Sequence, residues 1–63
     1  MVIAEIKPTL NQIVRHDGSF YTFEAAIFRR HKKTGEFYYQ AELKDQSAER
    51  SILVCDLKDV ETT

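Results

Sequence analysis

The 63-residue sequence has a single cysteine, a single proline, two glycines and no tryptophan. One cysteine excludes an internal disulfide, and the two histidines have no second cysteine near them, so no zinc-binding pattern is present. No apolar run approaches the roughly 20 residues that cross a bilayer. A chain this short buries only about 60% of the surface that its unfolded form exposes. Its stability must therefore come from an efficient core or from self-association.

The charge is also nearly balanced, with a net value of −1. Proteins that bind DNA mainly by electrostatics are usually basic overall, so a nucleic-acid function here requires a local basic patch. The first residues, MVIAEIKP, place an acid and a base inside the apolar stretch and do not resemble a signal peptide. We expect a single cytoplasmic domain over residues 1–63, in which residues 1–11 form an arm or an extra strand. No cofactor is expected.

Both glycines fall where a β-hairpin needs them. Asp17-Gly18 lies between two segments of alternating polarity, and this pair is typical of a two-residue type I′ turn. Lys33-Thr34-Gly35 suits a three-residue loop with Gly35 in the left-handed conformation. The sequence therefore predicts two hairpins, of which the second is longer.

Apolar residues alternate with period two on both sides of the second turn, which is typical of half-buried strands. The expected core face carries Tyr21, Phe23, Ala25 and Ile27 on one strand and Phe37, Tyr39, Ala41 and Leu43 on the next. With Lys33–Gly35 as the loop, the opposed pairs are Ile27 with Ala41, Ala25 with Leu43, Glu24 with Lys44, and Lys32 with Glu36. Apolar residues then face each other and the charged pairs have opposite signs, so this register is predicted.

The remaining elements are short. Gln12–Arg15 predicts a first strand, and Ser51–Cys55 predicts a compact apolar fourth strand. Asp56–Asp59 predicts one helical turn with Asp56 as its N-cap, followed by a last strand at Val60-Glu61. Val2–Ile6 is either an extra strand or an arm. The expected fold class is all-β, an antiparallel meander of five strands with one short helical turn near the C-terminus.

This outline resembles the small five-stranded β-barrels of the Src-homology-3 or tudor type. In such barrels a one-turn helix separates the fourth and fifth strands, and tudor-like domains often end in a strand followed by an Asp-Leu-(Arg/Lys) turn. Val54-Cys55-Asp56-Leu57-Lys58 is similar to that ending. The resemblance covers residues 12–61 at superfamily level and implies an Src-homology-3-like barrel, but no particular activity. A tudor-type aromatic cage would draw on Phe20, Tyr21, Tyr38 and Tyr39, two of which fall on the expected core face.

The second hairpin is expected to have a basic tip, which consists of Arg29, Arg30, Lys32 and Lys33 around His31. These side chains suit contacts to phosphates, with neighbouring aromatic rings stacking on unpaired bases. The alternatives are a turn that is simply kept soluble by its charge, and contact with an acidic protein partner. The sequence leaves all three interpretations open.

A second apolar set is the more informative feature. If the Tyr21 face is the core, then Phe20, Phe28 and Tyr38 point outward. A very small barrel cannot cover both of its faces, and exposed apolar patches usually indicate a partner, unless Val2–Ile6 folds over this one. We therefore expect a small interaction or assembly module that self-associates or binds a protein partner through these residues. Such a module suits an accessory protein of a bacterium, a phage or a mobile element, and the alternative is a nucleic-acid-binding accessory protein that uses residues 29–33.

Residues with catalytic or metal-binding chemistry are isolated. His16 and His31 have no nucleophile beside them, and Cys55 lies in the most apolar strand, as a buried hydrophobic residue would. The acidic residues from Asp56 to Glu61 lack the glycine-containing loop of a calcium site. We therefore predict that the protein is not an enzyme and has no metal site.

Overall fold

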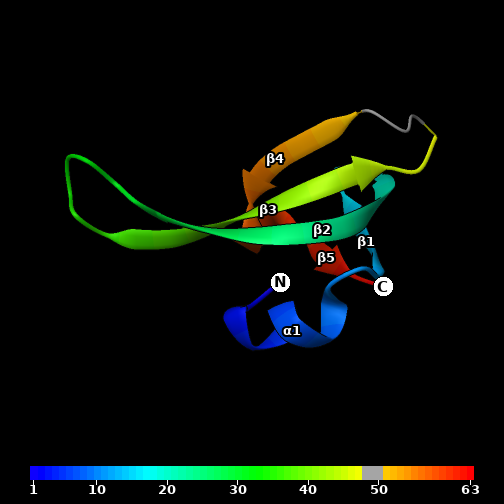
Figure 1. Cartoon of the computed structure of the whole chain (residues 1–63), viewed down its shortest axis with the longest axis horizontal. Coiled ribbons are helices and arrows are strands. Elements are labelled where there is room, and N and C mark those ends of the chain that lie inside the picture. The colour runs from blue at the N-terminus through cyan, green and yellow to red at the C-terminus, as the bar shows by residue number, and fades with distance from the viewer. Residues whose placement is uncertain (48–50) are drawn as a thin grey trace.

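One antiparallel β-sheet organises the chain in a computed structural model that describes residues 1–47 and 51–63 (Figure 1). The elements are η1 (Ile3–Glu5), α1 (Ile6–Thr9), β1 (Ile13–His16), β2 (Ser19–Arg30), β3 (Phe37–Asp45), β4 (Ile52–Asp56), η2 (Leu57–Asp59) and β5 (Glu61–Thr62). The strands lie in the order β4-β3-β2-β1-β5, so β4 and β5 form the two edges of a sheet that is not closed. The small all-β fold with a helical turn between the last two strands is confirmed, whereas closure into a barrel is not.

The first hairpin forms as the sequence predicts. Asp17 and Gly18 have φ angles of 49° and 79°, and positive values at both positions are what a type I′ turn requires. The turn aligns β1 with the start of β2, so that His16 pairs with Ser19. The other side of β1 pairs with the two-residue strand β5.

The second hairpin has a longer loop than the sequence predicts. Gly35 does have the expected positive φ, 73°. However, the His31 N–H donates to the Glu36 carbonyl at 2.8 Å, and the Gly35 N–H donates to the His31 carbonyl at 2.9 Å. The loop therefore contains four residues, 32–35, and His31 rather than Lys32 stands opposite Glu36. Four-residue loops of this kind are common, and the glycine satisfies them as well as it would the shorter one.

A β-bulge at Glu24 shifts the pairing a second time. Phe23 pairs with Leu43, but the next pair along the strands is Ala25 with Glu42, so Glu24 is an extra residue. The predicted pairs Ile27–Ala41, Ala25–Leu43, Glu24–Lys44 and Lys32–Glu36 are therefore wrong. The longer loop displaces the register by one residue throughout, and the bulge displaces it by one more toward the start of β2.

The bulge also exchanges the two faces of β2 beyond Glu24. Ala26, not Ala25, pairs with the buried Ala41 and packs against the core. Phe28 pairs with Tyr39 and so lies on the same side of the sheet as the core, whereas Ile27 lies on the opposite side. Side chains alternate between the two faces of β2 both before and after the bulge, but the alternation shifts by one residue at Glu24.

The core lies on one face of the curled sheet and beneath the C-terminal turn. Its buried hydrophobic residues are Val14, Phe23, Ala41, Leu43, Leu57 and Val60. Leu57 belongs to η2 and Val60 follows it, so this turn closes the core rather than merely linking two strands. The predicted turn and the N-cap position of Asp56 are confirmed, but the predicted hydrogen bonds to the Asp56 side chain are not formed.

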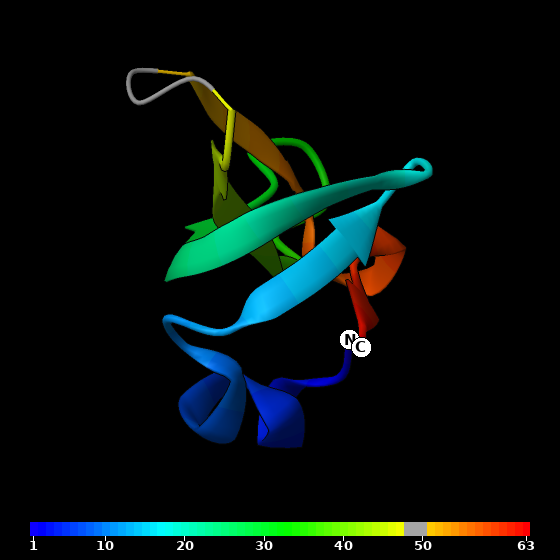
Figure 2. The ribbon, with the colours of Figure 1, turned by 90° about the vertical axis from the view of Figure 1, so that its right-hand side faces the viewer.

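The N-terminal segment is helical and not the extra strand that was one expectation for Val2–Ile6. It lies below the concave side of the sheet (Figure 2), where Ile6, Leu10 and Met1 pack against the core. The Val2 N–H donates to Glu5 Oε1 at 2.9 Å, and the ammonium group of Met1 donates to the Val60 carbonyl. The N-terminus therefore lies beside Val60, immediately before β5.

Candidate functional site

A β-ribbon projects from the body of the sheet. β4 pairs with β3 only from Gln40 to Lys44, and β1 pairs only with the first residues of β2. Residues 28–39 therefore have no sheet neighbour except each other, and they form an arm that extends beyond β4 (Figure 1). We call this segment the hairpin arm.

Three aromatic rings share the core-side face of the hairpin arm. The Phe28 ring centroid lies 5.0 Å from those of Phe37 and Tyr39, tilted to the first and edge-on to the second, which are favourable aromatic geometries. Phe28 and Phe37 are nevertheless 53% and 65% exposed. The arm carries the apolar face of the sheet past the point where the core ends.

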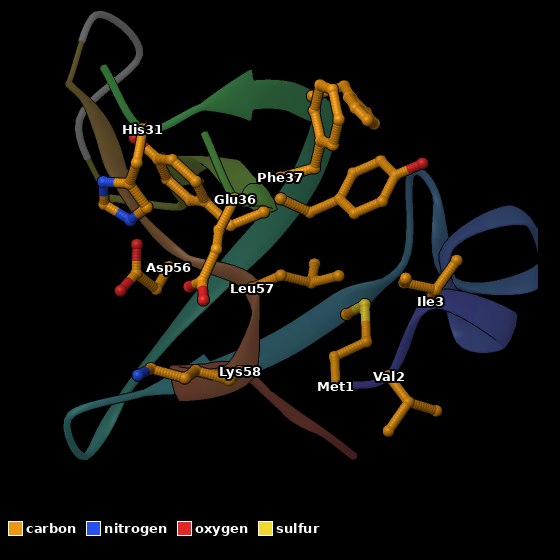
Figure 3. Close-up of a pocket in the computed structure, with 12 residues that line it drawn as sticks. Met1, Val2, Ile3, His31, Glu36, Phe37, Asp56, Leu57 and Lys58 are labelled. Carbon is orange, nitrogen blue, oxygen red and sulfur yellow. The ribbon is translucent and has the colours of Figure 1, made fainter. Parts of the chain in front are cut away.

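These rings form one wall of a groove of about 770 Å³, which we call the aromatic groove (Figure 3). Its other apolar lining comes from Met1, Val2, Ile3 and Leu57. Four polar side chains, His31, Glu36, Asp56 and Lys58, lie together on one side of it, away from Met1, Val2 and Ile3 (Figure 3). Both signs of charge are present, so the groove has no simple preference for an anion or a cation.

The basic tip is exposed, but its cations do not form one patch. Arg30 lies with its guanidinium 5.7 Å from the centre of the Phe37 ring and donates from Nε to the Gly35 carbonyl at 3.3 Å. Arg29 is adjacent in the strand and therefore points to the opposite face. Lys32 and Lys33 lie in the loop, beside His31. One arginine is thus already engaged with the arm itself, and the other faces away from it.

The three residues of the predicted interaction surface are not all placed together. Phe20 and Tyr38 lie on the face opposite the core, near opposite ends of the long hairpin, and the bulge puts Phe28 on the core side. Phe20 is 54% exposed, whereas Tyr38 is half-buried under a stacked His31 ring at 4.3 Å. Phe28 and Tyr38 nevertheless both line the aromatic groove, whereas Phe20 does not.

The edge of the sheet formed by β4 was not predicted from the sequence. Its residues Ile52, Leu53 and Val54 are 57%, 37% and 46% exposed, so apolar atoms are accessible on both faces of one strand. Asp56 is the only charged residue of β4, and proline is absent from it. The signal was visible in SILVC, which shows no polar alternation and so could not be assigned a solvent face.

The two histidines and Cys55 each contact other groups of the described residues. His16 Nδ1 lies 3.0 Å from the Asp59 carbonyl oxygen, and His31 is held against Tyr38. Burial, followed by the charges of Asp59 and Asp56, raises the pKa of the Cys55 thiol, which reduces its thiolate fraction. In residues 1–47 and 51–63, no three His, Cys, Asp or Glu side chains gather as a metal site would need.

Comparisons with known protein families, curated proteins and solved structures gave no match for this chain. Among the described residues, no helix has the length and apolar character to cross a membrane. The hairpin arm and the β4 edge carry most of the large exposed hydrophobic side chains of the described residues.

Proposed function

We propose that the protein is a small non-enzymatic assembly module that associates with a second copy of itself. The observation that carries this proposal is the amount of exposed apolar surface. Nine large hydrophobic side chains of the described residues are exposed, whereas six hydrophobic residues are buried. Isolated exposed hydrophobic residues are ordinary, but here they gather in the aromatic groove and along β4, and contiguous patches of this kind indicate a binding surface.

The size of the chain supports the same proposal. A domain of this length with no disulfide has little core to stabilise it, and pairing with another copy adds burial that the single chain lacks. The net charge of −1 means that two copies repel each other only weakly. Self-association is therefore favoured by composition as well as by surface.

We also propose that the fold is Src-homology-3-like. The five-stranded antiparallel sheet and the position of η2 between β4 and β5 support it. The departure from a barrel is at the β4 edge, which pairs with β3 alone. An edge that closure would otherwise cover is then free for a partner.

A second candidate function is nucleic-acid binding by the hairpin arm. The specific observation in its favour is that Arg29, Lys32 and Lys33 are exposed on an arm that also carries exposed aromatic rings. Against it stands the engagement of Arg30 with Phe37 and Gly35, which lowers the number of cations that converge on one face. Phosphate binding would weaken steeply as salt rises, because it releases counterions.

Size-exclusion chromatography with light scattering separates these candidates. We expect a dimer whose fraction rises with protein concentration and changes little between low and high salt. A monomer at every concentration up to about 1 mM, where even weak pairs form, contradicts the proposed function. Retention of a mixed oligonucleotide pool that is lost in Arg29→Glu/Lys32→Glu establishes the second candidate, and retention that is unchanged in that variant excludes the basic tip.

A further inference from the structure

We infer that the partner surface is the β4 edge, and that two copies join β4 to β4 in an antiparallel pair across a two-fold axis at Val54. This inference rests on the proposed self-association and specifies its geometry. The result would be one continuous sheet of ten strands with the two β4 strands at its centre. A two-fold contact uses the same surface on both copies, so it closes after two chains and does not build a fibre.

The backbone of β4 has a ladder of hydrogen-bonding groups that point away from β3. The Asp45 N–H donates to the Ser51 carbonyl at 3.1 Å, which makes these two residues a hydrogen-bonded pair of the antiparallel ladder. Such pairs alternate along the strands, so within β4 the groups of Leu53 and Cys55 point to β3. The N–H and C=O groups of Ile52, Val54 and Asp56 point to the open edge. An edge of this kind is a ready template for another strand.

The register follows from which outward groups can meet. Centred on Val54, the strands pair Ile52 with Asp56 of the second copy, Val54 with its own counterpart, and Asp56 with Ile52 of the second copy. All three outward residues of each strand are then used. Centring on Leu53 or on Cys55 instead leaves Asp56 or Ile52 respectively without an outward partner inside β4. The Val54 register therefore forms the most hydrogen bonds.

The side chains agree with this register. The exposed Val54 side chains of the two copies lie directly beside each other, and the exposed Leu53 lies beside Cys55 of the second copy on the core side. The only charges of β4 are the two Asp56 carboxylates, which stand four residues apart, about 13 Å. That separation exceeds the Debye length of about 8 Å at physiological salt, so their repulsion is small.

The other surfaces fit a second copy less well. The opposite edge, β5, has two residues, and Thr62 and Thr63 there are already bonded to Glu5 and to the Ile13 carbonyl. The rings of the aromatic groove already pack against one another. Four polar side chains line its other side, and a partner that bound there would have to remove water from them. Among the described residues, β4 has no strand partner on its outer side, and it contains no lysine or proline to discourage pairing.

Disulfide trapping tests the register. In the Val54 register, Leu53 and Cys55 of the second copy form a non-hydrogen-bonded pair, with Cα atoms about 4.5 Å apart, within disulfide range. We expect the Leu53→Cys variant to form a covalent dimer under mild oxidation. Wild type and the double variant Leu53→Cys/Cys55→Ser should remain more than about tenfold less cross-linked, because neither presents both thiols.

Each other outcome has a distinct meaning. A covalent dimer of wild type places Cys55 against Cys55, and one of the double variant places position 53 against position 53. Either result overturns the Val54 register while the edge pairing remains. A non-covalent dimer that gives no cross-link in any variant overturns the inference but leaves the proposed function standing. A monomer in light scattering overturns both.

A second pair of variants checks the surface without any cross-link. Val54→Asp places two carboxylates beside each other at the axis, and we expect it to weaken the dimer at least about tenfold. Val54→Thr keeps the branched shape and should retain most of the dimer. Ile13→Asp changes an exposed apolar residue of β1, which lies three places from β4 in the sheet, and should leave the dimer unchanged. If Phe28→Asp abolishes the dimer and Val54→Asp does not, the interface is the groove and this inference is wrong.

Discussion

Two phenylalanines on one strand offer a sharp test of the fold. Phe23 is completely buried, whereas Phe20, three residues earlier on the opposite face of β2, is 54% exposed. Replacing a buried phenylalanine by alanine costs about 3–5 kcal/mol, from lost burial and the cavity that remains. A domain of this length has a total stability of roughly 3–9 kcal/mol, so Phe23→Ala should lose at least about a third of it and unfold outright if the starting stability lies near the lower value.

The same substitution at Phe20 removes a ring that is only half covered. Burying a whole phenylalanine is worth about 1.5–3 kcal/mol, so Phe20→Ala should cost about 1 kcal/mol or less. The measurement is urea unfolding followed by tyrosine fluorescence, at one fixed protein concentration because a dimer makes the midpoint concentration-dependent. If Phe23→Ala fails to fold at all, Phe23→Leu supplies a measurable value of about 1.5 kcal/mol.

The comparison can fail in a clear way. Should Phe20→Ala destabilise the protein as much as Phe23→Ala, the face assignment on β2 is wrong. An equal and small effect of both would mean that the core does not lie under this strand. Either result would also remove the basis for placing Phe28 on the core side.

Three further predictions concern local chemistry. Gly35→Ala should lower the free energy of unfolding by about 1–2 kcal/mol, because φ is positive there and the new Cβ would lie 3.2 Å from a guanidinium nitrogen of Arg30. Gly18→Ala, where a Cβ has open space, should lower it only by the backbone strain of about 1 kcal/mol. Thermal or urea unfolding measures both values. The backbone N–H of Ser47, and then its hydroxyl, lower the pKa of Asp45, so this contact stabilises the fold above the unfolded value of 3.8 and is lost as pH falls through the lower folded pKa. Ser47→Ala removes the hydroxyl and keeps the backbone N–H, so it should raise that pKa only part of the way in a carboxyl NMR titration, and no change would refute the contribution of the hydroxyl. Burial raises the pKa of the Cys55 thiol, so alkylation at pH 8 should be several-fold faster in urea than in the native protein, and equal rates would contradict its partly buried position.

The hairpins were predictable because their signals are local. Asp17-Gly18 needs positive φ at both residues, and few other sequences provide it, so the turn was readable without any tertiary information. Gly35 likewise marked the second turn, although one glycine suits a four-residue loop as well as a three-residue one. The number of residues in that loop was therefore not determined by the sequence alone.

The bulge was not predictable from alternation. Ala25 and Ala26 stand side by side, and both are small and apolar, so either one suits the core. Ile27 and Phe28, further along, are also both apolar. The alternation of polar and apolar residues therefore could not show which of the two faces the core. What decides the phase is packing against the buried Ala41, a contact between strands that the sequence of one strand does not show.

The N-terminal helix and the open edge were missed for different reasons. Ile3–Thr9 is too short for a helical period to be recognised. Whether β4 lies at an edge depends on the order of all the strands in the sheet. The local sequence of β4 does not determine that order. The resemblance to closed barrels also favoured covering that edge.

The extra residue at Glu24 determines how β2 would respond to a change in its length. Removing that single residue would place Ala25 directly after Phe23, and their partners Glu42 and Leu43 are already neighbours on β3. The pairing would then be uninterrupted, and Phe28 would remain opposite Tyr39 beside the aromatic groove. Among related sequences, loss of one residue here should therefore straighten β2 without moving the aromatic rings to the other face of the sheet.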